Sequence, residues 1–192
     1  MSGSQRIKYG TGREALVEAA VRVVARHGLH GMTFRKVAAE AGVNNSLVAH
    51  HFGSLAALSA AALEWSFTTA LRDSHLPTFG ESESDYKEAL ASTLEHEIDL
   101  HVYQFEMVLE ASRDDAIRSQ IREMYDLYTR EIRHSLFGED ASPQQVATAR
   151  AVFASLDGLV LQYVGGGIDR AEFDAAVSAL WNLAGLVSAP RA

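Results

Sequence analysis

Several features that mark other classes of protein are missing from this sequence of 192 residues. It contains no cysteine, which excludes disulfide bonds and thiolate metal sites. Only three prolines occur, and no alternation of apolar and polar residues persists long enough to predict a β-strand. No apolar run approaches the ~20 residues of a membrane span, and the first residues lack the basic and then apolar profile of a secretory signal. We therefore expect an all-α protein that lies in the cytoplasm and does not associate with a membrane.

The net charge of −8 hides opposite balances in two parts of the chain. Residues 1–52 carry seven Lys and Arg against three Asp and Glu, a net charge of +4. Residues 53–192 carry ten against twenty-two, a net charge of −12. A basic N-terminal part in an acidic chain is typical of a protein in which only that part contacts nucleic-acid phosphates. Chance clustering of charge on an acidic surface is the alternative.

The stretch from Thr33 to Phe52 predicts two short helices separated by a tight turn. Thr33 is suited to cap the first helix, and Gly42 is suited to the turn, since glycine adopts positive φ without a steric clash. Val48 and Phe52 keep the second helix against the first, and its other side is polar. Apolar residues of the first helix recur at i, i+3, i+4 and i+7, and so share one face: Phe34, Val37, Ala38 and Ala41. This pattern indicates a helix-turn-helix that reads a DNA major groove.

The same stretch resembles the DNA-binding domain of the TetR family of transcriptional regulators. The family pattern is T-x-x-x-[IV]-A-x-x-A-G-V followed by an aromatic-or-His pair and Phe. Here it consists of Thr33, Val37, Ala38, Ala41, Gly42, Val43, His50, His51 and Phe52. The resemblance implies a three-helix DNA-binding domain in residues 1–53 and a helical effector-binding and dimerisation domain in residues 54–192. It also implies a homodimeric repressor that binds a palindromic DNA operator and is released by a small apolar or amphipathic effector.

Eight residues are candidates for DNA contact. Asn44 and Asn45 begin the second helix of the motif, where an amide can pair with adenine, which is worth ~1–3 kcal/mol of discrimination. The others carry hydroxyl, imidazole or basic groups suited to phosphates: Thr33, Arg35, Lys36, Ser46, His50 and His51. The alternative is that these side chains are ordinary solvated helix surface.

Two positions depart from the usual pattern of the family. Ala49 stands where many members have Tyr, and Leu55 stands where many have Lys. Both positions usually contact phosphate, so we expect affinity to depend more on other groups, such as Arg6 and Lys8 of the N-terminal arm.

Capping residues and apolar stripes predict the remaining helices. Helices are expected to begin after Ser54, Asp114, Ser142 and Asp169, and Ser142 has the strongest signal, with Pro and Gln one and three residues later. One long helix is expected over residues 84–112, because five apolar residues form a single stripe along it: Leu94, Ile98, Val102, Phe105 and Leu109.

Seven residues of the middle helices are candidates for an effector pocket. Glu97 and His101 lie four residues apart on one helical face, where they could anchor a polar group of a ligand or form a surface ion pair. The other five are large and apolar, and such residues are more often core than ligand contacts: Trp65, Phe105, Met124, Tyr125 and Tyr128.

His96 and His101 superficially resemble a zinc-binding pair. Five positions turn a helix by about 500°, so the two imidazoles point some 140° apart and cannot chelate one ion. This excludes a zinc hydrolase of that kind. We also expect no other metal site, no cofactor and no catalytic residue.

The last two helices are apolar over wide faces. In the family this pair packs against its copy to form the dimer interface, and the candidate residues are Phe153, Leu156, Val160, Tyr163, Val177 and Trp181. The alternative is that these residues complete the core of a single protomer.

Two other functions remain open. The chain could be an enzyme or a carrier that uses a C-terminal cavity and keeps a vestigial DNA head, although no nucleophile–base arrangement or phosphate-binding glycine loop is present. It could also be a nonspecific DNA binder, in which case salt dependence would dominate its affinity.

Overall fold

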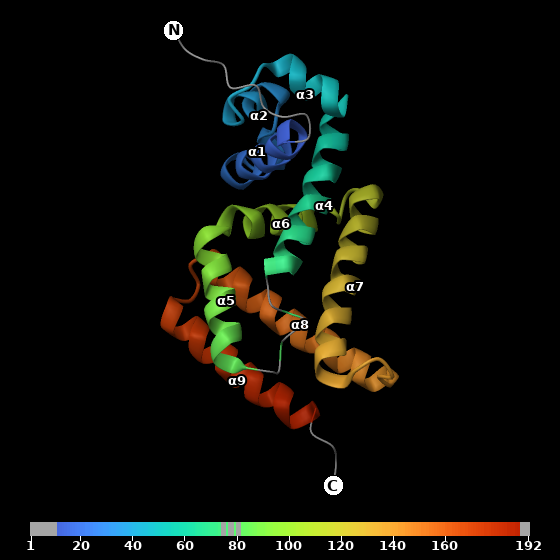
Figure 1. Ribbon diagram of the computed structural model, residues 1–192, viewed down its shortest axis with the longest axis vertical. Coiled ribbons are helices and arrows are strands. Elements are labelled where there is room, and N and C mark those ends of the chain that lie inside the picture. The colour runs from blue at the N-terminus through green and yellow to red at the C-terminus, as the bar shows by residue number, and fades with distance from the viewer. Residues whose placement is uncertain (1–10, 74–75, 77–78, 80–81, 189–192) are drawn as a thin grey trace. The chain divides into compact units, whose positions relative to one another are not determined.

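The computed structural model describes residues 11–73, 76, 79 and 82–188, and every regular element in these ranges is a helix (Figure 1). The predicted all-α fold is therefore confirmed for this part of the chain. In chain order the elements are α1 (Thr11–His27), the 3-10 helix η1 (Leu29–Gly31), α2 (Phe34–Glu40), α3 (Asn45–Phe52), α4 (Leu55–Asp73), α5 (Glu83–His96), α6 (Ile98–Glu110), α7 (Asp115–Phe137), α8 (Pro143–Val164) and α9 (Arg170–Ser188).

The chain forms two compact units. The N-terminal unit comprises Met1–Phe67 and Val102–Gln120, and the C-terminal unit comprises Thr68–His101 and Ile121–Ala192. Three helices, α4, α6 and α7, therefore contribute residues to both units. The predicted boundary after residue 53 concerns a division of function, which these units do not test, and it stays a prediction.

The first three α-helices enclose an apolar core in the N-terminal unit, where α2 packs against α1 and α3. Its buried residues include Leu16, Val17, Val24, Val37, Ala38 and Val48, and burying each of the larger aliphatic side chains contributes roughly 1.5–3 kcal/mol. Glu40 of α2 accepts hydrogen bonds from two side chains of α1, Arg22 Nε at 2.8 Å and Arg26 Nη1 at 3.1 Å. These contacts hold α2, and with it the turn that leads to α3.

Helix α6 packs against the first half of α4 within the N-terminal unit. The hydroxyl of Tyr103, which is fully buried, donates to the carbonyl of Ser59 at 2.8 Å. Burial raises the pKa of Tyr103, so this group is a neutral donor. Gln120 at the start of α7 donates to the carbonyl of Ala60 at 3.4 Å. The first half of α4 is thus held by residues from both α6 and α7.

The single long helix predicted over residues 84–112 is wrong, because the chain forms two helices that meet at Glu97. Glu97 has φ −127° and ψ 30°, outside the helical region. The predicted stripe is therefore not one face: Leu94 is buried, whereas Ile98 and Leu109 are 42% and 66% exposed. The buried face of α6 consists instead of Leu100, Tyr103, Gln104 and Met107.

The predicted starts of four helices are confirmed by capping hydrogen bonds. In each, a backbone N–H of the first turn donates to the capping side chain at 2.8–3.4 Å, at Ser54, Asp114, Ser142 and Asp169. The caps at Ser142 and Asp169 are reciprocal, because Gln145 and Glu172 accept from the backbone N–H of the capping residue at 2.8 and 2.9 Å. Local sequence therefore determines where these helices begin.

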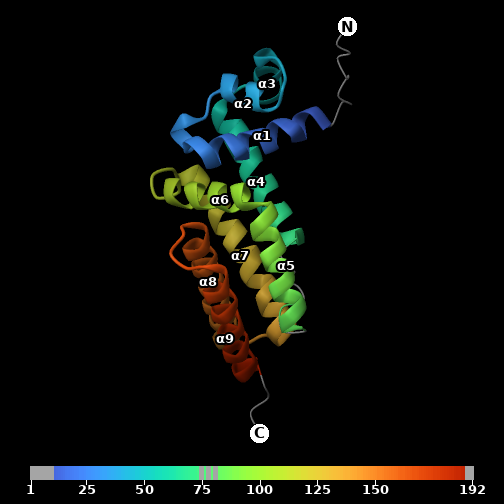
Figure 2. The same ribbon diagram turned by 90° about the vertical axis from the view of Figure 1, so that its left-hand side faces the viewer.

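The last two helices pack side by side and antiparallel in the C-terminal unit (Figure 2). Phe173 and Val177 of α9 are buried. Trp181 of α9 packs on the rings of Phe79 and Tyr86, with ring centroids 4.8 and 5.7 Å away. The inner face of α9 is therefore occupied by residues of its own protomer.

No single helix in the described ranges is long and apolar enough to span a membrane. α3 and α4 reach that composition only when they are taken together, across a bend of 78°.

Candidate functional site

The helix-turn-helix is built by two caps and one glycine. The Thr33 hydroxyl accepts a hydrogen bond from the backbone N–H of Lys36 at 3.2 Å and so begins α2. Gly42 has φ +67°, which makes the turn after α2 accessible to glycine and strained for other residues. Asn44 Oδ1 accepts from both the backbone N–H and the hydroxyl of Ser46 at 3.0 Å, and so begins α3. Thr33, Asn44 and Ser46 therefore all have local structural roles.

The inner side of α3 is fixed to the rest of the N-terminal unit. Val48 is completely buried. The guanidinium of Arg13 lies over the ring of Phe52, 5.0 Å from its centroid, and joins the start of α1 to the end of α3. His51 is partly buried, with its ring 6.3 Å from that of Phe52 and 5.5 Å from that of His50. These contacts determine which side of α3 faces outward.

The outward side carries the remaining candidates. Arg35, Lys36, Asn45 and His50 are all exposed. In the part of the chain that the structure describes, the side chains of Arg35, Lys36 and Asn45 make no hydrogen bond or ion pair. Their charged and amide groups are thus available to a partner. The side-chain amide of Asn45 is therefore available for contact with a base, whereas the Oδ1 of Asn44 is already engaged in capping α3.

The two positions that depart from the family pattern are also at the surface. Ala49 is exposed on α3, and Leu55, at the first position of α4, is 37% exposed. Neither side chain can form a hydrogen bond with a phosphate. Arg6 and Lys8, which were expected to compensate, lie outside the described residues.

Acidic groups of the N-terminal unit that lie near α2 are neutralised by α1. Glu40 is paired with Arg22 and Arg26, and Glu18 lies 3.7 Å from Arg22. Arg35 and Lys36 are not part of these pairs. The positive charge at the start of α2 is therefore left for an anionic partner.

The seven candidate pocket residues divide between the two units. Trp65 and Phe105 belong to the N-terminal unit, and Glu97, His101, Met124, Tyr125 and Tyr128 belong to the C-terminal unit. Within the latter, Tyr125 and Tyr128 both pack on Phe153 of α8, with ring centroids 5.8 and 5.1 Å apart. Met124 and Tyr128 are almost completely buried.

His101 is half-buried, and its Nε2 atom is shielded from solvent. Burial lowers its pKa to about 4, and its Nε2 has no hydrogen-bond partner among the described residues. It therefore does not form the surface ion pair with Glu97 that the sequence allowed. His96, by contrast, is exposed and its Nδ1 lies 2.8 Å from the carbonyl of Ser92. No group of three or more potential metal ligands occurs in the described ranges.

Sequence reasoning missed Asp157, which lies on α8 one turn after Phe153. Its carboxylate accepts a hydrogen bond from the hydroxyl of Tyr125 at 3.2 Å. Burial raises the pKa of Asp157. A signal was present, because Asp157 is the one acidic residue in an otherwise apolar and neutral segment of α8.

Each of the six candidate interface residues makes contacts within its own protomer, and three of them, Phe153, Tyr163 and Trp181, keep part of their surface exposed. Leu156, Val160 and Val177 are buried, Phe153 contacts the rings of α7, and Trp181 contacts Phe79 and Tyr86. The ring of Tyr163 packs on Phe173, with centroids 5.2 Å apart. The outer surface of α8 and α9 is different: it has a shallow groove of about 150 Å³ lined by Thr148, Ala151, Val152, Ser155, Leu180, Leu183 and Ala184.

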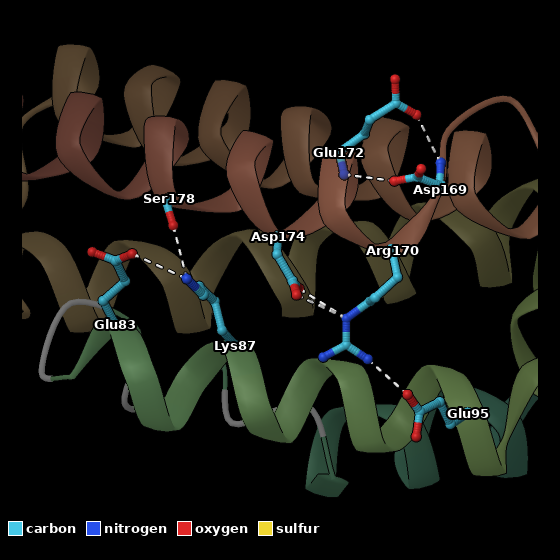
Figure 3. Close-up of polar contacts among 8 residues, drawn as sticks. All are labelled: Glu83, Lys87, Glu95, Asp169, Arg170, Glu172, Asp174 and Ser178. Atoms are coloured by element: carbon cyan, nitrogen blue, oxygen red, sulfur yellow. Dashed lines mark hydrogen bonds and ion pairs between the residues drawn. The ribbon is translucent and has the colours of Figure 1, made fainter.

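A second groove, between α5 and α9, is polar (Figure 3). Arg170 donates to Asp174 at 3.0 Å and to Glu95 at 2.7 Å, and the hydrogen bonds to Asp174 raise the pKa of Arg170. Lys87 donates to Ser178 at 2.9 Å and to Glu83 at 3.5 Å. Because both cations already have carboxylate partners, this cluster fastens α5 to α9 rather than forming an open binding site.

Both the N-terminal and the C-terminal part of the chain match models of known protein families. Residues 16–62 match the family model described as bacterial regulatory proteins, tetR family, and residues 81–183 match the model described as tetracyclin repressor-like, C-terminal domain. The HTH-type transcriptional regulator BetI of Agrobacterium fabrum is 48% identical over 42 residues, which cover 22% of this chain and 20% of that relative. The match thus spans only about a fifth of the relative's length.

Two solved structures share the fold over most of their length. A transcriptional regulator from Rhodococcus sp. RHA1 has a TM-score of 0.76 at 22% identity, over 93% of this chain and 99% of that chain. A putative transcriptional regulator from Saccharomonospora viridis, solved in complex with choline, has a TM-score of 0.71 at 20% identity, over 90% and 95%. With a helix-turn-helix at one end and the family's C-terminal domain over more than half of its length, the chain belongs to the TetR family of transcriptional regulators.

Proposed function

We propose that this protein is a homodimeric repressor that binds a palindromic DNA operator in the cytoplasm and leaves it when a small molecule occupies the C-terminal unit. The observation that carries the DNA-reading part is the exposed surface of α2 and α3. There Arg35, Lys36 and Asn45 have no partner among the residues that the structure describes, while the inner side of α3 is fixed by Val48 and Phe52.

The roles of the DNA-contacting residues follow from these contacts. Asn45 reads a base, since its amide is exposed at the start of α3 and can pair with adenine in the major groove. Arg35, Lys36 and His50 contact phosphates, which sets the register of α3 in the groove. Thr33, Asn44 and Ser46 contribute chiefly by holding the ends of α2 and α3, and His51 by its contact with Phe52.

The dimer is proposed to form through the outer surface of α8 and α9. Leu161 and Leu183 are 50% and 62% exposed there, next to small residues that allow close approach of a second copy, such as Ala151 and Gly158. A two-fold interface places Leu183 of each protomer against the groove of the other. The six interface residues expected from the sequence lie on the same two helices and hold this surface in place through their contacts within the protomer.

Release from DNA requires only that the effector bind one arrangement of the dimer better than another. The candidate effector residues in the C-terminal unit are His101, Tyr125, Tyr128 and also Asp157. The choline complex of the Saccharomonospora relative supports a small-molecule ligand for this type of domain.

The test is a binding selection from randomised duplex DNA with the full-length protein, followed by sedimentation analysis of the selected complex. We expect enrichment of a palindrome bound by two protomers. Failure to enrich any sequence at low salt would refute the proposal that the protein is a transcriptional regulator. Equal binding of all duplexes with a steep salt dependence would indicate a nonspecific DNA binder.

A further inference from the structure

The two charged residues of α8 have very different surroundings. Arg150 Nη2 donates to Asp126 Oδ1 at 2.6 Å, and both side chains are more than half exposed. Asp157 lies on the same face seven residues later, which is ~10.5 Å along the helix axis and too far to share this arginine. Among the described residues, the one hydrogen bond to the Asp157 carboxylate comes from the hydroxyl of Tyr125, a neutral group.

Two aromatic residues lie near this carboxylate: Tyr125, which donates to it, and Phe153 on the same helix. Phe153, one turn earlier on α8, packs on Tyr125 and Tyr128 of α7 with centroid separations of 5.8 and 5.1 Å. Tyr125 and Phe153 each keep part of their surface exposed, whereas Tyr128 is buried. Tyr125, Phe153 and Asp157 are thus all partly accessible to a ligand.

The chemistry of this cluster selects the charge of its ligand. Burial makes the negative charge of Asp157 unfavourable, because no cation among the described residues lies within 4.0 Å to compensate for the lost hydration. A cationic ligand would supply the missing charge, and the faces of aromatic rings also attract cations. An anionic ligand would be repelled by the carboxylate.

We propose that Asp157, Tyr125 and Phe153 bind the positively charged head group of an organic ammonium compound, whose apolar part packs on the neighbouring rings. This inference rests on the proposed effector function and names the chemical class of that effector. A lysine or arginine from a second copy of the chain is the competing occupant, and the test separates the two.

The test compares three probes with the same apolar tail: octyltrimethylammonium, 1-octanol and octanoate. Each is titrated calorimetrically into full-length wild-type protein, Asp157→Asn and Asp126→Asn. The wild type should bind the cation at least about tenfold more tightly than the alcohol or the carboxylate. Asp157→Asn should abolish this preference, because the amide keeps the shape and the contact with Tyr125 but not the charge. Asp126→Asn removes a nearby exposed carboxylate and should leave the preference unchanged.

Equal binding of cation and alcohol by the wild type would overturn the proposal, as would an unchanged cation preference in Asp157→Asn. Absence of cation binding combined with dissociation of the dimer in Asp157→Asn would assign the carboxylate to a contact between protomers instead. Operator binding measured without any probe keeps the two claims separate. If the protein binds its operator but not the cation, only the proposal of a cationic effector is refuted. If it binds the cation but no operator, only the proposed regulatory function is refuted.

Discussion

The polar side chains proposed to contact a partner are exposed to solvent in the N-terminal unit and largely buried in the C-terminal unit. In the N-terminal unit, Arg35, Lys36 and Asn45 are exposed, and their side chains form no hydrogen bond or ion pair with the described residues, so they are available to a large, highly charged partner. In the C-terminal unit, His101 and Asp157 are largely withdrawn from water, and burial shifts the pKa of each toward its neutral form. The first arrangement suits an extended polyanion, and the second suits a small molecule that must replace lost hydration.

The largest expected effect comes from the interior of the C-terminal unit. Phe173→Ala should lower the free energy of unfolding by about 3–5 kcal/mol, because the side chain is 1% exposed and packs on Tyr163. Denaturant titration measures this change. The control is Leu109→Ala on α6, an apolar residue that is 66% exposed and should change stability by no more than about 0.5 kcal/mol. Similar losses in the two variants would contradict the assignment of Phe173 to the core.

The next effect is a pH dependence that arises from His101. Its pKa of about 4 in the folded protein lies below the ordinary value of 6.5, so the unfolded chain binds more protons between these values. Stability should therefore fall as the pH falls from 7 to 4.5, by about 2–3 kcal/mol from this group. His101→Gln should lack this component when both proteins are unfolded with urea across the range. Parallel profiles would show that His101 is not withdrawn from water.

Substitutions of the two neighbouring asparagines of the motif should have different effects, one on the recognition of DNA bases and the other on the stability of the fold. Asn45→Ala should weaken operator binding by about 1–3 kcal/mol and leave the melting temperature unchanged. Asn44→Ala should reduce the stability of the N-terminal unit by about 1 kcal/mol, because it removes the cap of α3. Fluorescence anisotropy with labelled operator and thermal melts followed by circular dichroism measure the two effects. A loss of stability in Asn45→Ala equal to that in Asn44→Ala would remove the distinction.

The smallest effect is expected at the surface cluster between α5 and α9 (Figure 3). Arg170→Ala should cost about 0.2–1 kcal/mol, since the arginine is 41% exposed and its ion pairs with Asp174 and Glu95 are solvated. Thermal melts at low and high salt should differ more for the wild type than for the variant. A cost of several kcal/mol would mean that this cluster contributes to the core.

Local signals in the sequence predicted local structure well. Thr33, Gly42 and Ser142 act within a few residues of themselves, through a cap or a positive φ, and each acts as its residue type predicts. The break at Glu97 was missed because neither proline nor glycine marks it and the apolar spacing continues across it. An apolar stripe identifies residues that seek burial, but it does not say which neighbour will bury them. For the same reason the sequence left open whether Trp181 and Val177 pack at an interface or within one protomer. Trp181 packs on Phe79 and Tyr86 of its own protomer, and its place at an interface stays a prediction.

Asp157 shows a different limit of the sequence. A single acid in an apolar helix indicates a special environment, but its partner Tyr125 is 32 residues away in the chain. Only the packing of α7 on α8 brings the carboxylate next to the hydroxyl of Tyr125. The charge preference of a binding site therefore depends on tertiary contacts that local patterns do not contain.

The central claim is that α3 reads DNA through Asn45, and one measurement tests it most directly. The selected operator and its single-base variants are titrated with wild-type protein and with Asn45→Ala at fixed salt. We predict that the wild type discriminates against replacement of one adenine in each half-site, and that Asn45→Ala binds those variants and the intact operator equally while keeping its preferences at the other positions. An unchanged preference at every position in Asn45→Ala would contradict the account.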